Sequence, residues 1–165
     1  MNQEWNKKRR LELLEYDTKT HLELLKDSED LKQQGKLLSN ELRSKLREYS
    51  VILVDHLNWE TRYQYLELLN KFIEKKIDIL KFRIAFCERY ESIEKVADLL
   101  KSNRVLLSPH ENSLDFGDLL SKIYDCCEAY SNDPKPFRNK FEIGDVEFST
   151  SIEKTYFQMK KFLQE

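Results

Sequence analysis

The feature that most restricts the fold of this chain is the scarcity of its turn-forming residues. Among 165 residues there are only three glycines and three prolines, and long stretches of the chain contain neither. All-β folds need many turn residues, and parallel α/β folds usually place glycine in their loops. We therefore predict an all-α protein.

The composition is that of a folded domain. Hydrophobic residues make up 40% of the chain and charged residues 35%, which is enough for every helix to have a buried stripe and a solvated face. The length fits one compact domain with room for an added helical arm. The three cysteines are odd in number and two are adjacent, which is not the pattern of a disulfide framework and favours a reducing compartment.

Charge and hydropathy exclude two classes of partner. The formal net charge of −2 gives no global attraction to nucleic acid, which requires a clear excess of lysine and arginine. No apolar run approaches the roughly 20 residues that span a bilayer, and no signal segment follows the basic cluster Lys7 to Arg10. We expect no direct nucleic-acid binding, no membrane insertion, and a location in the cytoplasm or, for an organelle-encoded protein, the organelle interior.

Residues 1–57 are predicted to form an N-terminal helical arm or hairpin. Leucines recur at steps of three and four over residues 3–49, and the apolar stripes are narrow, as in a coiled-coil seam. The break between the two helices is expected near residues 27–30, where Ser28 would cap the second helix, or near Gly35. The arm packs on the rest of the chain, binds a partner or self-associates, and these alternatives stay open.

Residues 58–165 are predicted to form the main helical domain. The β-branched run at 50–57 is interpreted as a helix end or a buried connector, and Asn58 as the N-cap of a following helix. The apolar residues of that helix are expected on one side, namely Trp59, Tyr63, Leu66, Leu69, Ile73 and Ile77. A further helix covers residues 79–100, with Ser92 as a candidate break, residues 103–113 form a loop, and a final helix begins near Asp145.

A helix predicted over residues 114–130 has the strongest pattern. At 100° per residue its apolar side chains occupy one half of the helical wheel, and its acids occupy the other. Between Glu111 and Asp133 there are six acids and one base, Lys122, which gives a local net charge of −5. Such a face either keeps the helix soluble or attracts a basic partner. The candidate partner-binding residues are Asp115, Asp118, Tyr124, Asp125, Glu128 and Asp133.

Little in the sequence indicates catalysis, a metal or a cofactor. The cysteines at 126 and 127 lie on the apolar half of their helix, and Cys87 follows Phe86, so unreactive buried thiols are favoured over nucleophiles. Adjacent cysteines lack the spacing of a zinc site, and the three glycines are too isolated for a phosphate-binding loop. We therefore expect no enzyme, no metal and no cofactor.

One enzyme-like pair remains as a less favoured alternative. The spacing of Arg104 and His110 resembles the arginine and histidine of the helical ribonucleases called HEPN domains. In those domains the pair lies on a helix, whereas Pro109 precedes the histidine in this sequence and indicates a loop. A ribonuclease role would require both side chains to reach one phosphate.

Residues 60–163 resemble the bacterial self-protective colicin-like immunity proteins, the group that includes the colicin D immunity protein. The resemblance runs through RYQYLELLNKF at 62–72, FRIAFCERY at 82–90 and DLLSKIYDCCEAY at 118–130. It continues with a Tyr-x-x-Asp-Pro turn that starts at Tyr130, and with the final helix. The first 57 residues have no counterpart in that family.

The resemblance implies a small helical bundle. Together with the pattern of residues 1–57, we predict a small antiparallel bundle of the four-helix type with an extra N-terminal helical hairpin or arm. It also implies a non-catalytic inhibitor that covers the RNA-binding active site of a basic nuclease-type toxin domain, or of another cationic protein, with an acidic helix face. The positions that match the acidic helix are Asp118, Asp125, Glu128 and Asp133, with Tyr124 as a contact. The alternative function is a helical structural or assembly protein of unknown partner that has kept the fold.

Overall fold

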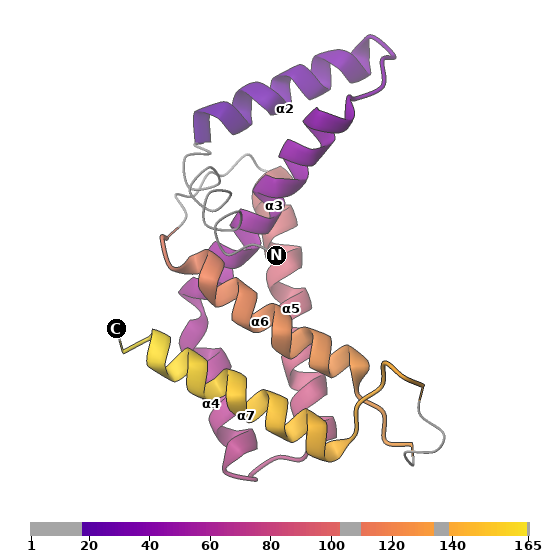
Figure 1. Ribbon diagram of the computed structural model, residues 1–165. Coiled ribbons are helices and arrows are strands. Elements are labelled where there is room, and N and C mark those ends of the chain that lie inside the picture. The colour runs from indigo at the N-terminus through magenta and orange to yellow at the C-terminus, as the bar shows by residue number, and fades with distance from the viewer. Residues whose placement is uncertain (1–17, 103–109, 134–138, 165) are drawn as a thin grey trace, which may run out of the picture. The chain divides into compact units, whose positions relative to one another are not determined.

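The computed structural model describes residues 18–102, 110–133 and 139–164, and these ranges contain six helices. They are α2 (Thr18–Gln33), α3 (Asn40–Glu60), α4 (Arg62–Ile73), α5 (Ile79–Ser102), α6 (Ser113–Ala129) and α7 (Asp145–Phe162), as Figure 1 shows. The prediction of an all-α protein is confirmed. None of the helices in these ranges combines the length and apolar character that crossing a membrane requires.

The chain divides into two compact units. Unit 1 comprises Met1–Trp59 and Ile93–Leu114, and unit 2 comprises Glu60–Ser92 and Asp115–Glu165. The predicted boundary between residues 57 and 58 lies close to the first division point. Residues 93–114 cluster with the N-terminal part of the chain, although they follow the first half of α5 in sequence.

In unit 1, a tight turn at Gly35 separates α2 from α3. Gly35 has a φ of 67°, and its N–H donates to the carbonyl of Lys32 at 3.0 Å, while the N–H of Lys36 donates to that of Leu31 at 2.9 Å. These two bonds form a Schellman motif, whose left-handed position favours glycine. The helix break therefore falls at Gly35. The predicted cap at Ser28 is wrong, because Ser28 lies buried inside α2.

Helix α3 is longer than the sequence indicated. Residues 50–57 lie within it, so their interpretation as helical is confirmed, but the helix ends only at Glu60. Asn58 is fully buried inside the same helix, and its predicted role as an N-cap is wrong. Buried Tyr49 and Leu53 of α3 pack with Ala97 of α5, and the partly buried side chains around this cluster are Val54, Leu57 and Leu100.

The buried side of helix α4 matches the predicted one only in part, because Leu69 is buried as expected and Leu66 and Ile73 are half-buried. Tyr63 was expected on the apolar side but is 67% exposed, whereas Tyr65, Leu69 and Phe72 are buried. The prediction counted 100° per residue from a helix start at Asn58. The helical backbone is instead interrupted at Thr61, so that count does not carry into α4.

Unit 2 contains four helices around an aromatic core, which confirms a small bundle of the four-helix type with an N-terminal helical hairpin before it. Phe82 of α5 lies between Phe72 of α4 and Phe148 of α7, with ring centroids 4.7 Å and 6.1 Å away. Tyr65 of α4 contacts Phe116 of α6 at 6.3 Å. Figure 1 shows α6 and α7 running in opposite directions. The break considered at Ser92 does not occur, because α5 continues through it.

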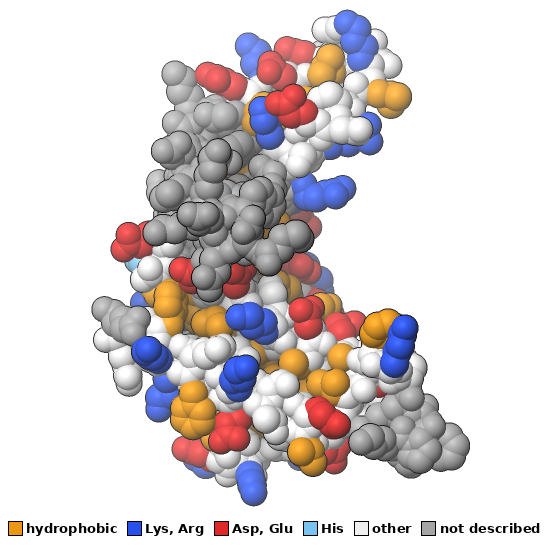
Figure 2. Space-filling model, in the orientation of Figure 1, with side chains coloured by type: hydrophobic (Ala, Val, Ile, Leu, Met, Phe, Trp, Pro, Cys, Tyr) orange, Lys and Arg blue, Asp and Glu red, His pale blue; other side chains and the backbone are white. Residues whose placement is uncertain are grey.

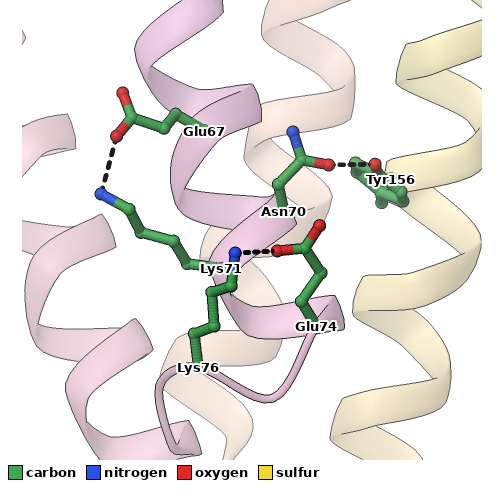
Figure 3. A network of polar contacts seen from close by, with 6 residues as sticks. All are labelled: Glu67, Asn70, Lys71, Glu74, Lys76 and Tyr156. Carbon is green, nitrogen blue, oxygen red and sulfur yellow. Dashed lines mark hydrogen bonds and ion pairs between the residues drawn. The ribbon is translucent and has the colours of Figure 1, made fainter.

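The outer side of α4 carries paired charges, and its inner edge bonds to α7, as Figure 3 shows. Lys71 forms an ion pair with Glu67 at 2.7 Å, and Lys76 pairs with Glu74 at 2.6 Å. The hydroxyl of Tyr156 in α7 donates a hydrogen bond to Oδ1 of Asn70 in α4. The charged surface of this helix is thus largely neutralised within the helix and the turn that follows it.

Candidate functional site

The apolar half of α6 is fixed in the core of unit 2. Phe116, Leu120, Ile123 and Cys127 recur at steps of three and four, and all four have no exposed surface. The predicted helix over 114–130 is confirmed by α6, and so is its buried side. Burial of large side chains on one stripe determines which residues of the same helix must face solvent.

The opposite side of α6 is exposed and mainly acidic. Asp118, Asp125 and Glu128 are exposed on it, and we call these three carboxylates the acidic face. Lys122 is exposed on the same side, so the four charges leave a net −2. In Figure 2, acidic side chains on the visible side of unit 2 lie among basic and hydrophobic ones. The acidic face is therefore a local strip of one helix and not a property of the whole unit.

Two of the predicted residues flank the acidic face. Asp115 is half-buried in the first turn of α6, where a carboxylate interacts favourably with the helix dipole. Asp133 is exposed beyond the end of the helix, and its N–H donates to Oγ of Ser131 at 3.2 Å. The two positions extend the run of carboxylates at both ends of α6.

The C-terminal end of α6 is held by Arg83 of α5. The Nε–H of Arg83 donates to the backbone carbonyl of Cys127 at 2.8 Å, and its guanidinium lies over the ring of Tyr130 at 5.0 Å. A cation that bonds a carbonyl in the last turn satisfies an orphan acceptor and interacts favourably with the helix dipole. The local sequence gives no signal for this contact, because the two partners are 44 positions apart.

A short chain pairing holds the same end of α6 from the other side. The N–H of Ile143 donates to the carbonyl of Ala129, and the N–H of Ser131 donates to that of Ile143, both at 2.9 Å. The hydroxyl of Tyr130 bonds Oδ1 of Asp145, at the start of α7, at 3.0 Å. The helix that carries the acidic face is therefore anchored at its C-terminal end to both α5 and α7.

Tyr124, predicted as a partner contact, edges the core. Its ring lies 5.0 Å from that of Tyr90 in α5, and Tyr90 stacks in turn on Phe86 at 6.2 Å. Tyr124 remains half-exposed beside Asp125, so part of its ring faces solvent. A rigid ring next to carboxylates is a common composition of interface hot spots.

Charge pairing distinguishes Asp125 and Glu128 from the acids of α4. Within the described ranges, no lysine or arginine forms an ion pair with either carboxylate, whereas Glu67 of α4 and Glu74, just after its end, are both paired. Ala129 and Asn132 occupy the positions four residues after Asp125 and Glu128, whereas Lys71 stands four residues after Glu67.

The remaining chemical groups do not form a recognisable catalytic or metal centre in the described part of the chain. No cluster of three or more histidine, cysteine or acidic side chains suited to a metal ion occurs there. Arg104 lies outside the described residues. His110 precedes α6 and is not helical, its ring stacks on Trp59 at 4.6 Å, and its Nδ1 accepts the N–H of Asn112 at 3.1 Å.

Comparison of this chain with known proteins found no relative. No protein-family model, curated protein or solved structure matches this chain. The resemblance to colicin-like immunity proteins stays a prediction that is based on the residues quoted above.

Proposed function

We propose that this chain is a non-catalytic protein-binding module that docks a cationic protein on the acidic face of α6. The observation that carries the proposal is the contrast between the two halves of this helix. One half is fully buried in an aromatic core, and the other exposes Asp125 and Glu128 without a lysine or arginine partner among the described residues. A rigid set of exposed carboxylates steers a basic partner and speeds association.

The class of partner that fits best is a basic nuclease-type toxin domain. The active site of a ribonuclease binds phosphates, and carboxylates held in a row on a helix offer a similar pattern of negative charge. The resemblance to colicin-like immunity proteins supports the same class. In this proposal the protein neutralises the toxin by covering its RNA-binding site with α6, and Asp118 and Tyr124 add contacts beside Asp125 and Glu128.

The proposal is tested by surface plasmon resonance with a panel of purified tRNA-cleaving toxin domains. We expect at least one member to bind the full chain at low salt, and the double variant Asp125→Lys/Glu128→Lys to bind about tenfold more weakly, mainly through slower association. The matched control is Glu67→Lys/Glu74→Lys on α4, which changes the net charge equally and is expected to bind like the native chain. Equal weakening by both variants, or no binding by any member, would contradict the proposal.

A second candidate function, helical assembly, is favoured by exposed apolar side chains of unit 1. Val51 of α3 is 53% exposed, and Val96 and Leu99 of α5 are 42% and 62% exposed. Val96 and Leu99 are three residues apart and so lie on one side of α5, and exposed apolar patches often mark protein contacts. If the chain assembles through these residues, analytical ultracentrifugation will show an oligomer for the native chain and a monomer for the variant Leu99→Gln. A native chain that is monomeric at all concentrations leaves the docking function as the better account.

A further inference from the structure

Two cysteines from different helices lie against each other in unit 2. The thiols of Cys87 in α5 and Cys127 in α6 lie close enough for each to change the pKa of the other. The neighbouring contact is independent of the sulfur atoms, since Arg83, one turn before Cys87, donates to the backbone carbonyl of Cys127 at 2.8 Å. These two contacts fix one turn of α5 against the last turn of α6.

The two thiols differ in their access to solvent. Cys87 is half-exposed, whereas Cys127 has no exposed surface. A reagent in solution can therefore react with Cys87, whereas Cys127 is not accessible to it. This arrangement of an accessible thiol backed by a buried one is what stepwise thiol–disulfide exchange requires.

The third cysteine is directed elsewhere. Cys126 is adjacent to Cys127, but the neighbour that lowers the pKa of its thiol, against the larger effect of burial, is Ser151 in α7. A disulfide between neighbours in a helix would distort the backbone, because each points about 100° away from the other. The geometry therefore selects one pairing among the three cysteines.

We propose that Cys87 and Cys127 form a dithiol site that takes low-molecular-weight disulfides, with glutathione disulfide as the model substrate, and closes into a disulfide between α5 and α6. The sulfur of Cys87 loses its proton and attacks one sulfur of the substrate, and a first glutathione thiolate leaves and takes up a proton. The sulfur of Cys127 then attacks that of Cys87. The mixed disulfide breaks, a second glutathione leaves with the proton of Cys127, and one disulfide has been reduced to two thiols.

The local electrostatics sets the speed of this reaction. Burial raises the pKa of the Cys87 thiol, and the Cys127 thiol and the Arg83 guanidinium oppose this shift. Burial also raises the pKa of Cys127 far above its usual range. Because the thiolate is the attacking species, closure is slow near neutral pH, and its rate rises about tenfold for each pH unit below the thiol pKa.

Closure of the site would not require the docking function. The bond would link α5 and α6 on the inner side of α6, whereas the acidic face lies on the outer side of the same helix. Its direct effect would be on stability, since a cross-link between distant positions restricts the unfolded chain. We expect the closed form to melt several degrees above the open form.

The test uses the full-length reduced chain incubated with glutathione disulfide at several pH values, followed by alkylation and peptide mapping. We expect one intramolecular disulfide between Cys87 and Cys127, formed faster at higher pH, with Cys126 alkylated. Cys127→Ala should stop at the mixed disulfide and retain one glutathionyl group on Cys87. The matched control, Cys126→Ser, should close like the native chain.

Two results would overturn the proposal, and both are measured on the native chain, so that neither depends on a variant that folds. The first is stable glutathionylation of Cys87 without closure after complete reaction. The second is a disulfide that involves Cys126, or a cross-link between two chains, as the main product. Either result would show that the buried thiol of Cys127 does not act on Cys87.

Discussion

The outer sides of α4 and α6 carry similar kinds of charge in opposite arrangements. On α4, Lys71 follows Glu67 by one turn and pairs with it at 2.7 Å, and in the turn after α4 Lys76 pairs with Glu74 at 2.6 Å (Figure 3). On α6, Asp125 and Glu128 have no lysine one turn later. A lysine four residues later thus pairs with Glu67, whereas Asp125 and Glu128 have no lysine at that position.

The comparison separates two roles of a charged helix face. The pairs on α4 are exposed, and exposed pairs contribute little to stability. Asp125 and Glu128 of α6 form no ion pair with a lysine or arginine among the described residues, and their helix is held by buried side chains and by Arg83. We therefore propose docking, rather than stability, as the role of Asp125 and Glu128.

The largest expected effect concerns the buried half of α6. Phe116→Ala removes a fully buried ring and should lower the free energy of unfolding by about 3 to 5 kcal/mol. Urea denaturation measures this loss. The matched control is Phe141→Ala, a ring that is 75% exposed, which should change stability by less than about 0.5 kcal/mol. Equal losses in the two variants would show that α6 is not held by its apolar side.

The next effect concerns the anchor of α6. Arg83→Met keeps the apolar stem but removes the bond to the carbonyl of Cys127, and should cost about 1 to 2 kcal/mol of stability. Lys81→Met on the same helix breaks only the exposed pair with Asp78 and should cost less than about 0.5 kcal/mol. If Arg83→Met leaves the free energy of unfolding unchanged, the end of α6 is fixed by the chain pairing at Ile143 alone.

A substitution in the turn after α4 is expected to raise stability. Lys75 has a φ of 57° in a Schellman motif, where its N–H donates to the carbonyl of Phe72 and the N–H of Lys76 to that of Lys71. Glycine removes the strain of this left-handed position, so Lys75→Gly should raise the free energy of unfolding by about 0.5 to 1 kcal/mol. The converse control is Gly35→Ala, whose added Cβ meets no atom within 4 Å, so that only backbone strain should destabilise it.

The smallest effect tests the pairing on α4 directly. The hydrogen bond and charge of Lys71 lower the pKa of Glu67, so this pair stabilises the fold above the ordinary glutamate pKa and ceases to do so as the pH falls through the lowered value. Lys71→Met should return the pKa of Glu67 toward its ordinary value in an NMR titration. Glu41, whose pKa is lowered by Lys45, is the internal reference and should not change.

The sequence predicted α6 well and α4 badly, for a physical reason. In α6 the apolar period is unbroken, so both ends of the helix and its buried side follow from spacing alone. Before α4 the helical backbone is interrupted at Thr61, and Asn58, a typical capping residue, is instead buried in α3. Local propensity could not reveal that tertiary burial extends α3 past Asn58.

The candidate site was predicted only as far as a single helix determines it. The helical-wheel pattern predicted that Asp118, Asp125 and Glu128 face solvent, and these side chains are exposed in the structure. Three contacts join segments that are far apart in sequence. They are the bond from Arg83 to Cys127, the contact of Tyr124 with Tyr90 and the interaction of Cys87 with Cys127. Such contacts depend on how helices pack, which residue spacing within one helix does not encode.

The central claim, that a partner docks on α6 and not on α4, is tested most directly by labelling exposed carboxylates with a carbodiimide. The free chain and its complex with the tightest-binding toxin domain of the panel are compared by mass spectrometry. Our account predicts that complex formation protects Asp125 and Glu128 from labelling and leaves Glu67 and Glu74 unchanged. Protection of the α4 residues, with full labelling of Asp125 and Glu128 in the complex, would contradict it.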